Sequence, residues 1–486
     1  MNKKPKLLSV AVFVALVGCS GVENRDQPNF SQLGMPSQWQ SSETRIESVN
    51  TPAQHYQLSD KASDSSSLYS PLLATTAQTR WVKNFNDPGL TLLVERVLSN
   101  NAGLAAEAAK VKSAGAGQVQ SESALYPTLD LTGSISQRQT GSITTDQQTV
   151  SLNAGFELDL WGKLSAREKE ASLNFAAARA SFTDTALELS AETATGWYNL
   201  IAQKKLLELY KRREDTLNNA LKVVEQGYSK GLKEVDDLYS ARKSLQNEKD
   251  TISAQQQVIS EQVRALQVLL GRYPDGRLLS DSGLELPELP TFKSDVLPSE
   301  LISRSPSLQS QWLTLLAADA GLAAANRDRF PSLSLSASVD QNIDWNLMAS
   351  LTQPLFNAGK LAAAEDKAAA EVEQQEKSYL QAVFSAFADV ENALMQETTL
   401  EHRYALASEN LVTARQSTAL ALSQYQLGLT ELDTLLSIQK SMLDTEAEVI
   451  RLQNQRLANR VSLYLLLGGD TRSVSSREAP KDAEAL

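Results

Sequence analysis

The chain has 486 residues, a formal net charge of −12 and one cysteine, Cys19. This acidity argues against nucleic acid as a partner, because phosphates would repel the protein. A single cysteine excludes an intramolecular disulfide framework. Beyond the N-terminus, no segment approaches the roughly 18 uninterrupted apolar residues that a transmembrane helix needs. Any part that crosses a membrane is therefore expected to consist of strands.

Residues 1–18 are predicted to be a signal peptide. Three lysines precede an apolar run, 7–17, which is too short to span a bilayer. The run ends in Leu-Val-Gly-Cys19, which resembles a bacterial lipobox, so Cys19 is the predicted lipidation site. A buried thiol beside an ordinary cleavage site is the alternative. Cleavage would change the net charge to −15 through the loss of those lysines, and the Ser- and Gln-rich residues 19–80 would form a lipid-anchored tether.

Two copies of one motif, 228–245 and 425–442, indicate an internal repeat with a constant offset in residue number from the first copy to the second. In both copies an alanine-rich helical pattern leads to a glycine, and acidic residues follow it. Glycine tolerates the left-handed position after a helix, and carboxylates favour the start of the next helix. Each copy therefore predicts the tip of a helical hairpin, with the tip residues Tyr228, Gly231, Leu232, Tyr425, Gly428 and Leu429.

A two-residue alternation of apolar and polar side chains replaces the helical period after Pro127 and again after Pro331. Each half is predicted to hold one β-hairpin, with strands at 129–136 and 150–160, then at 333–340 and 345–356. These lengths suit the roughly ten residues of a transmembrane strand. The first hairpin is seven residues longer than the second, and the extra length is expected in a polar loop at 137–148.

Long helices are expected on both sides of each tip. In the first half they cover 163–228 and 232–270, and Asp87 is expected to cap an earlier helix over 88–125. Apolar residues recur every seven positions from Leu238 to Leu266, which predicts coiled-coil packing. The seam between them contains Glu248, Gln255 and Gln262 and is expected to face water.

The domain order follows from these patterns. Repeat 1 covers 81–283, a linker covers 284–298, repeat 2 covers 299–468, and residues 469–486 form a charged tail. Four strands cannot close a barrel, and an open sheet edge in lipid leaves backbone groups unpaired. Other copies must supply strands. A dimer would give eight and a trimer twelve, and twelve leave room for a channel.

Several motifs resemble those of the TolC/OprM outer-membrane factors. They are the Trp81…Phe85-x-Asp87-Pro88 opening, Asn100-Asn101, Glu157-Leu-Asp-Leu-Trp-Gly-Lys163, Pro354-Leu-Phe-Asn-Ala-Gly-Lys360 and both Tyr-x-x-Gly-Leu tips. The resemblance implies an α+β membrane protein and a homotrimer. It implies a transmembrane β-barrel with four strands per chain, continued by a long periplasmic α-helical barrel. The implied function is the outer membrane channel of a tripartite multidrug efflux system, with a periplasmic adaptor and an inner-membrane pump of the RND or MFS class.

By this resemblance the tips form the periplasmic gate and the adaptor docking site. Some members close the gate with an arginine after the second tip glycine, whereas this chain has Thr430 there. Its own tip carboxylates are candidates for the gate or the pore lining: Glu234, Asp236, Asp237, Glu431 and Asp433. Their alternative role is to start helices. The two tip tyrosines could pack between helices instead of touching a partner.

The remaining features favour no chemistry. His55 and His402 are isolated, so no metal is predicted, and no cofactor or catalytic constellation is found. Trp161 and Trp345 suit an interfacial aromatic girdle or the filling of a junction. The expected location is the outer membrane, where the protein is lipid-anchored and in contact with lipid. A structural or adhesive coiled-coil surface lipoprotein is the alternative function, and a lipid-anchored enzyme is the third.

Overall fold

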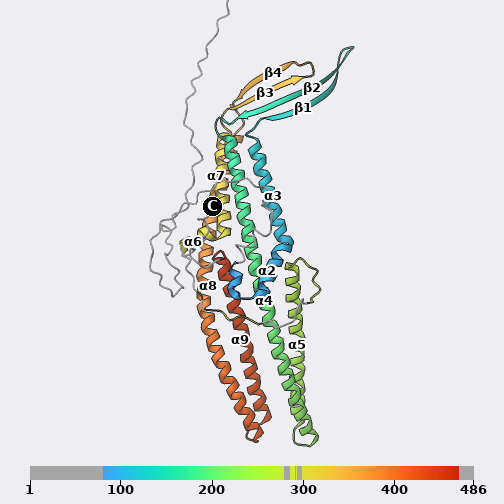
Figure 1. The fold of residues 1–486 in the computed structure, drawn as a ribbon, viewed down its shortest axis with the longest axis vertical. Coiled ribbons are helices and arrows are strands. Elements are labelled where there is room, and N and C mark those ends of the chain that lie inside the picture. The colour runs from blue at the N-terminus through green and yellow to red at the C-terminus, as the bar shows by residue number, and fades with distance from the viewer. Residues whose placement is uncertain (1–79, 278–284, 291, 293–297, 470–486) are drawn as a thin grey trace, which may run out of the picture. The chain divides into compact units, whose positions relative to one another are not determined.

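The computed structural model describes residues 80–277, 285–290, 292 and 298–469. The predicted signal peptide, Cys19, most of the tether, part of the linker and most of the tail lie outside the described residues. In chain order the elements are η2 (Arg80–Phe85), α2 (Pro88–Asn100), α3 (Ala102–Ser123), β1 (Thr128–Thr140), β2 (Ile143–Leu158), α4 (Lys163–Ser229), α5 (Val235–Leu269), α6 (Pro298–Arg304), α7 (Pro306–Arg327), β3 (Ser332–Asp340), β4 (Trp345–Thr352), α8 (Lys360–Gln426) and α9 (Leu432–Leu466) (Figure 1).

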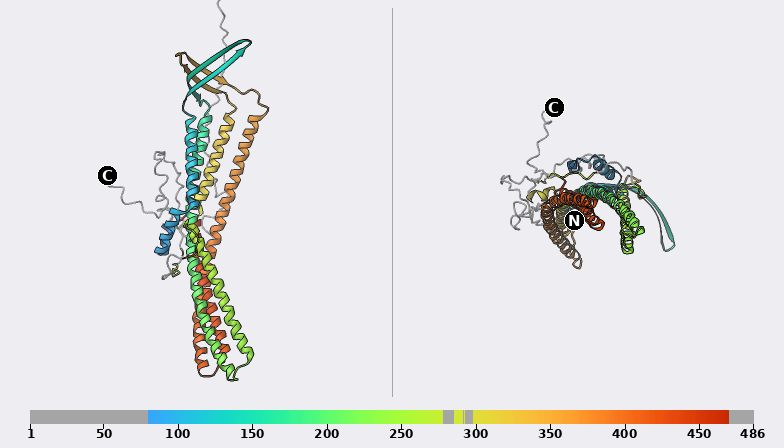
Figure 2. Two further views of the ribbon diagram at one scale, coloured as in Figure 1. Left: turned by 90° about the vertical axis from the view of Figure 1, so that its right-hand side faces the viewer. Right: turned by 90° about the horizontal axis from the view of Figure 1, so that it is seen from below.

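The same order of elements occurs in both halves of the chain. Helices α4 and α8 have 67 residues each, and α5 and α9 have 35 each. The offset in residue number from Lys163 to Lys360, where α4 and α8 begin, equals the offset from Tyr228 to Tyr425 in the tip motif. The C-terminal ends of α4 and α8, and both ends of α5 and α9, are separated by the same offset. Figure 2 shows the two helical hairpins, α4 with α5 and α8 with α9, from two further directions.

The expected helix over 88–125 is wrong in one respect, because it is two helices separated at Asn101. Asp87 caps the first as predicted, since its Oδ1 accepts a hydrogen bond of 3.0 Å from the Leu90 N–H. Asn101 has extended backbone angles, and its Oδ1 accepts from the Leu104 N–H at 2.9 Å. Its Nδ2 donates to the Leu269 carbonyl at 3.0 Å, so one side chain starts α3 and holds the end of α5.

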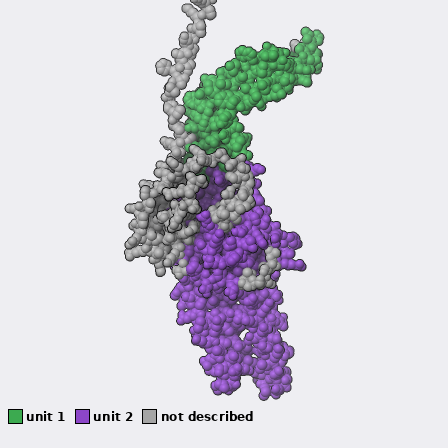
Figure 3. All heavy atoms as spheres, in the orientation of Figure 1, with its two compact units in different colours: residues 1–28, 114–175, 313–376 green, residues 29–113, 176–312, 377–486 purple. Residues whose placement is uncertain are grey.

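The chain divides into two compact units (Figure 3). Among the described residues, the first unit consists of 114–175 and 313–376 and contains the sheet. The second unit consists of the remaining described residues and contains the helical hairpins with their tips.

The sheet of the first unit has the antiparallel order β1-β2-β3-β4. Its register aligns Leu131 with Leu152, Leu152 with Val339 and Val339 with Trp345, so the apolar positions of all four strands share one face. The opposite face carries residues such as Asn153, Glu157 and the β3 serines. The predicted separation into an apolar and a polar face is confirmed, and large apolar side chains of the first face are exposed: Leu129, Leu131, Ile135, Val150, Leu152, Trp345, Leu347 and Leu351.

The predicted polar loop at 137–148 is wrong. β1 continues to Thr140 and β2 begins at Ile143, so a turn of two residues joins them. The extra seven residues lengthen the strands, because backbone pairing needs no apolar side chain: Gln137 pairs with Asp146 and Gln139 with Thr144. β4 also ends at Thr352 and does not reach residue 356.

Trp161 fills the junction between β2 and α4. Its ring stacks on Phe330 with centroids 5.4 Å apart, and its Nε1 donates to the Pro331 carbonyl at 2.7 Å. Asp159 accepts hydrogen bonds from the first-turn N–H groups of Leu164 and Ser165 and so starts α4. Trp161 is 37 % exposed and makes these junction contacts, whereas Trp345 lies at the start of β4 and is 77 % exposed.

An aromatic cluster lies in the core of the second unit. Trp81 stacks on Tyr464 at 5.5 Å, and Phe85 lies 5.5 Å from Tyr198. All four side chains belong to one buried cluster that joins η2, α4 and α9. The Trp81…Phe85 opening of the sequence is therefore a core motif.

Two of the three residues of the polar seam of α5 do not face water, contrary to expectation, and the third, Gln262, is half-buried. Glu248 and Gln255 are buried, as are Leu238 and Leu245 of the apolar series. Gln255 donates to the carbonyl and the side-chain oxygen of Gln203 on α4, and Glu248 accepts from Arg213 on α4. Direct pairing with α4 gives partners to Gln255 and to one carboxylate oxygen of Glu248, so these two positions of the seam form part of the hairpin interior.

Asp184 on α4 gives the second unit a pH dependence. Burial, and next the negative charge of Glu188, raise the pKa of Asp184 to about 6, although hydrogen bonds from Ser307 oppose the shift. A folded-state pKa above the unfolded value of 3.8 means that charged Asp184 destabilises the fold at pH 7. That penalty is relieved as the pH falls through 6 toward 4.

Asp184→Asn is therefore expected to stabilise the protein at pH 7.5 and to flatten its stability between pH 5 and pH 7.5. A pKa shift of about two units corresponds to about 2.7 kcal/mol of unfolding free energy for a fully buried group. Solvent screening reduces this to about 1 kcal/mol for Asp184. Thermal unfolding of detergent-solubilised protein at both pH values measures the effect. Glu188→Gln is the milder comparison, and a larger gain from Asp184→Asn at pH 5 than at pH 7.5 would contradict the assignment.

Candidate functional site

Both predicted tips are turns with the same hydrogen bonds. The Gly231 N–H donates to the Tyr228 carbonyl at 2.9 Å, and the Leu232 N–H donates to the Gly227 carbonyl at 2.8 Å. Gly428 and Leu429 repeat this pair of bonds after α8. The glycines have φ values of +69° and +72°. This is the left-handed helix ending that the sequence predicts at both positions.

Some apolar residues of the tips are exposed, and others are packed between helices. Leu232 and Leu429 are 77 % and 74 % exposed, although leucine is normally buried. Tyr425 packs against a buried cluster formed by Val224, Leu238 and Leu432. That cluster takes residues from both hairpins, so the structure brings the two tips together within one chain. Tyr228 is exposed and does not have the packing role of Tyr425.

The five candidate carboxylates occupy helix starts. Glu234 and Glu431 are the N-cap residues of α5 and α9. Asp237 accepts a hydrogen bond of 3.2 Å from the Glu234 N–H, and its carboxylate lies 3.7 Å from Lys233 Nζ. Asp236 and Asp433 lie in the first turns of the same helices, on exposed positions. This placement matches the helix-start reading, and the pore-lining role stays a prediction.

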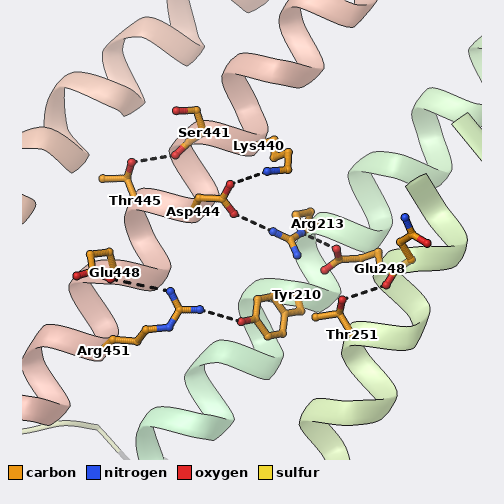
Figure 4. A network of polar contacts seen from close by, with 11 residues as sticks. Tyr210, Arg213, Glu248, Thr251, Lys440, Ser441, Asp444, Thr445, Glu448 and Arg451 are labelled. Carbon is orange, nitrogen blue, oxygen red and sulfur yellow. Dashed lines mark hydrogen bonds and ion pairs between the residues drawn. The ribbon is translucent and has the colours of Figure 1, made fainter. Parts of the chain in front are cut away.

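A network of charged residues above the tips joins three helices (Figure 4). Arg213 of α4 donates from Nε to Glu248 of α5 at 2.6 Å and from Nη1 to Asp444 of α9 at 3.0 Å. Asp444 also accepts from Lys440 at 2.8 Å. Glu248 is almost completely buried, while Asp444 is half exposed. Arg213 therefore neutralises a buried carboxylate and connects the two hairpins.

Further polar contacts between α4 and α9 follow the same face. Arg212 donates to Glu446 at 2.7 Å, Arg451 donates to the Tyr210 hydroxyl at 3.3 Å, and Asn454 donates to Asn199 at 3.3 Å.

We did not predict this network from the sequence, although a usable signal exists. Arg213 precedes the first tip glycine, Gly231, by nearly the same stretch of chain as that by which Asp444 follows the second, Gly428. Two hairpins that reverse at one level bring such positions to the same height. Opposite charges at matching distances from the two tips therefore indicate an ion pair between the hairpins.

A second buried ion pair fastens α8 to α9. Arg460 donates to Glu397 at 2.5 Å, and Asn459 donates to the other oxygen of that carboxylate at 2.8 Å. The guanidinium lies 4.8 Å from the centre of the Phe292 ring. All charges in this cluster have partners, so its role is to join helices.

Within the described ranges, no group of three or more His, Cys, Asp and Glu side chains is placed to bind a metal ion. Over the same ranges, none of the helices combines the length and the apolar character that a membrane crossing requires.

The left-handed tip conformation can be tested with matched glycine substitutions. Neither Gly428 nor Gly117, which lies inside α3, has an atom within 4 Å of an added Cβ, and only Gly428 has a positive φ. Gly428→Ala is expected to cost about 1–2 kcal/mol locally, whereas Gly117→Ala is expected to be neutral or stabilising. Gly428→Pro also removes the N–H that bonds to Tyr425. Hydrogen exchange of the Leu429 amide measures the effect, and equal protection in all variants would contradict it.

The buried pair of the network predicts an unequal series of stabilities. Arg213→Met leaves Glu248 buried without a counter-charge and is expected to cost about 3 kcal/mol. The double variant Arg213→Met/Glu248→Leu should recover most of this loss. Asp444→Asn, at a half-exposed position, should cost less than about 1 kcal/mol. Thermal unfolding of the purified protein provides the ranking, and an additive double variant would refute the buried-charge explanation.

The sequence of this chain is similar to those of known outer membrane efflux proteins. The family model described as "Outer membrane efflux protein" matches residues 93–272 and 297–469. The pyoverdine export outer membrane protein OpmQ of Pseudomonas aeruginosa is 28 % identical over 426 residues, covering 83 % of this chain and 90 % of its own. The cation efflux system protein CusC of Escherichia coli K12 is 26 % identical over 485 residues, covering 96 % and 99 %.

Solved structures agree. A CusC structure covers 80 % of this chain and 94 % of its own with a TM-score of 0.70 and 26 % identity. The VceC outer membrane protein of Vibrio cholerae has the same fold with a TM-score of 0.72 and 21 % identity, covering 80 % and 98 %. Since the family model spans both halves and both tips, this chain belongs to the outer membrane efflux protein family, whose members are channels of the TolC type.

Proposed function

We propose that this chain forms a homotrimeric exit duct in the outer membrane, the last component of a tripartite efflux system. An inner-membrane pump of the RND or MFS class supplies drugs and other small toxic molecules, and a periplasmic adaptor joins the pump to the duct. The observation that carries the proposal is the exposed apolar face shared by four strands, in a family of outer membrane efflux proteins.

The sheet supports the trimer. Its apolar face suits contact with lipid, and its polar face suits an aqueous lumen. β1 and β4 each lie at an edge of the described sheet, and unpaired edges are costly in lipid. Three copies would supply twelve strands and close the barrel around a channel. The helical hairpins of three copies would form the periplasmic α-barrel, and the domain boundaries at 81–283 and 299–468 would be repeats of one unit.

The tips support adaptor docking. Leu232 and Leu429 place exposed apolar side chains beside the tip glycines, and a buried cluster holds the two tips together. Exposed apolar patches of this kind suit a protein partner. Tyr228 would join this surface, while Tyr425 would support it from inside. Gate carboxylates would be drawn from Glu234, Asp236, Asp237, Glu431 and Asp433, and Cys19 would carry the lipid anchor.

A surface lipoprotein with a structural or adhesive coiled coil remains the second candidate. The long helices favour it, but a stalk has no use for an amphipathic sheet whose apolar side chains gather on one exposed face. The two functions predict different behaviour in a bilayer.

The purified trimer is expected to conduct ions when it is inserted into a planar bilayer, because a twelve-stranded barrel leaves an aqueous lumen. Deletion of the gene is expected to sensitise cells to hydrophobic toxic compounds. A monomer that never conducts would refute the duct.

Docking is tested separately with Leu232→Asp/Leu429→Asp, which should abolish cross-linking to the adaptor and export but leave conductance intact. Tyr273→Asp is the control, because Tyr273 is 86 % exposed but follows the opposite end of α5.

A further inference from the structure

A polar cavity lies in the second unit, at the end of α9 that is distant from the tips. Its volume is about 400 Å³, which is at the low end of the range for small-molecule sites in proteins. Segments that are distant in the sequence meet around it, and its walls include Lys83, Asn84, Phe85, Pro290, Arg460 and Tyr464. Neither the proposed duct nor adaptor docking uses this cavity.

Tyr464 offers one hydrogen-bond donor to the cavity. Its hydroxyl oxygen accepts a hydrogen bond of 3.1 Å from Asn84 Nδ2. A tyrosine hydroxyl can both accept and donate, and among the described residues no acceptor takes the Tyr464 hydrogen. Trp81 stacks on the ring at 5.5 Å and holds it in the aromatic core. The core therefore fixes a hydroxyl whose hydrogen is free for a ligand.

Arg460 adds a second unused donor. Its side chain is 4 % exposed. Its hydrogen bonds to Glu397 and to the Pro290 carbonyl, at 2.5 Å and 3.0 Å, both come from Nη2. The Nε–H group is buried and has no acceptor in the part of the chain that the structure describes. A buried donor without a partner is costly, so native proteins rarely keep one without a reason.

Lys83 supplies the net charge of the cavity. The positive charge of Arg460 is balanced by Glu397, because the two side chains form a buried ion pair. Lys83 is exposed and forms no ion pair within the described ranges. An ammonium group has donors and no acceptor. The cavity therefore carries one unbalanced positive charge beside two unused donors.

We propose that this cavity binds a small monocarboxylate. The carboxylate oxygens accept hydrogen bonds from the Tyr464 hydroxyl and the Arg460 Nε–H group, and Lys83 balances the negative charge. Charge-assisted hydrogen bonds of this kind are stronger than neutral ones. The apolar part of the ligand contacts Phe85 and Pro290, which also line the cavity.

A singly charged acid fits the cavity better than a phosphate ester does. A carboxylate carries one negative charge at pH 7 and balances Lys83. A phosphate monoester carries about −1.5 to −2, and Glu397 would repel the excess because Arg460 already balances that carboxylate. The amides of Asn84 and Asn86 both donate and accept, which suits an amide group on the ligand. Acylated amino acids combine these features.

Equilibrium dialysis of radiolabelled N-acetyl-leucine against the full-length protein in detergent tests the site. Saturable binding is expected with a Kd of about 1 mM, which is typical of a ligand of this size. N-acetyl-leucinamide has the same shape but no charge, and it is expected to bind about tenfold more weakly. Equal affinity for the acid and the amide would overturn the role of the carboxylate.

Variants of the cavity locate the binding. Lys83→Met removes the unbalanced charge and should raise the Kd about tenfold, whereas Lys83→Arg should keep it within about twofold. Tyr464→Phe removes the donor, keeps the ring and should raise the Kd about fivefold. Lys222→Met is the matched control, because Lys222 is exposed on α4 near the first tip, and it should leave the Kd unchanged. Thermal unfolding of each variant checks that the fold is intact.

Three results would overturn the proposal. The first is equal affinity in the wild-type protein and Lys83→Met, or equal losses from Lys83→Met and Lys222→Met, because the acid would then bind elsewhere. The second is inorganic phosphate that displaces N-acetyl-leucine with a lower Kd, and the third is the absence of saturable binding. A conducting trimer that binds no acid would refute the cavity site and leave the duct intact, whereas a non-conducting monomer that binds the acid would refute only the duct.

Discussion

The contact between α4 and α9 is the interaction on which the second unit depends. It joins the two hairpins, and it mixes apolar clusters with the Arg213 network. Glu248 makes the arrangement directional. A buried carboxylate tolerates few partners, so α4 must present Arg213 at one height relative to α5 and α9. Apolar packing alone would allow the helices to slide by a heptad with little change in buried area.

The equal lengths of the paired helices make the two hairpins equivalent. Since α4 and α8 have the same number of residues, as do α5 and α9, both hairpins reverse at the same level. The apolar cluster of Val224, Leu238 and Leu432 joins the two hairpins near their tips inside the chain, so the two turns are not independent of each other.

Much of this architecture follows from local sequence. The tip glycines, the Asp87 cap, the start of α4 at Lys163 and the division of the strands into two faces all depend on residues close in the chain, and these predictions are confirmed. The wrong predictions concern positions whose structure depends on contacts with residues distant in the sequence. Polar residues at 137–148 resemble a loop by composition, but cross-strand hydrogen bonds make them strand. Glu248 resembles a solvated side chain until Arg213, on the preceding helix, is placed beside it. The pore-lining and docking roles of the tip residues depend on other subunits and stay predictions.

The open sheet has a consequence for biogenesis. A lone chain would present to water a continuous apolar face and two strand edges, β1 and β4, which is the combination that drives non-native association. The helical hairpins differ from the sheet, because buried ion pairs such as Arg213–Glu248 and Arg460–Glu397 form within one chain. Maturation should then proceed in two stages with different reaction orders: the hairpins fold at a rate independent of chain concentration, and the sheet inserts at a rate that rises steeply with it. Low expression would leave folded hairpins on chains that wait for chaperones or are degraded.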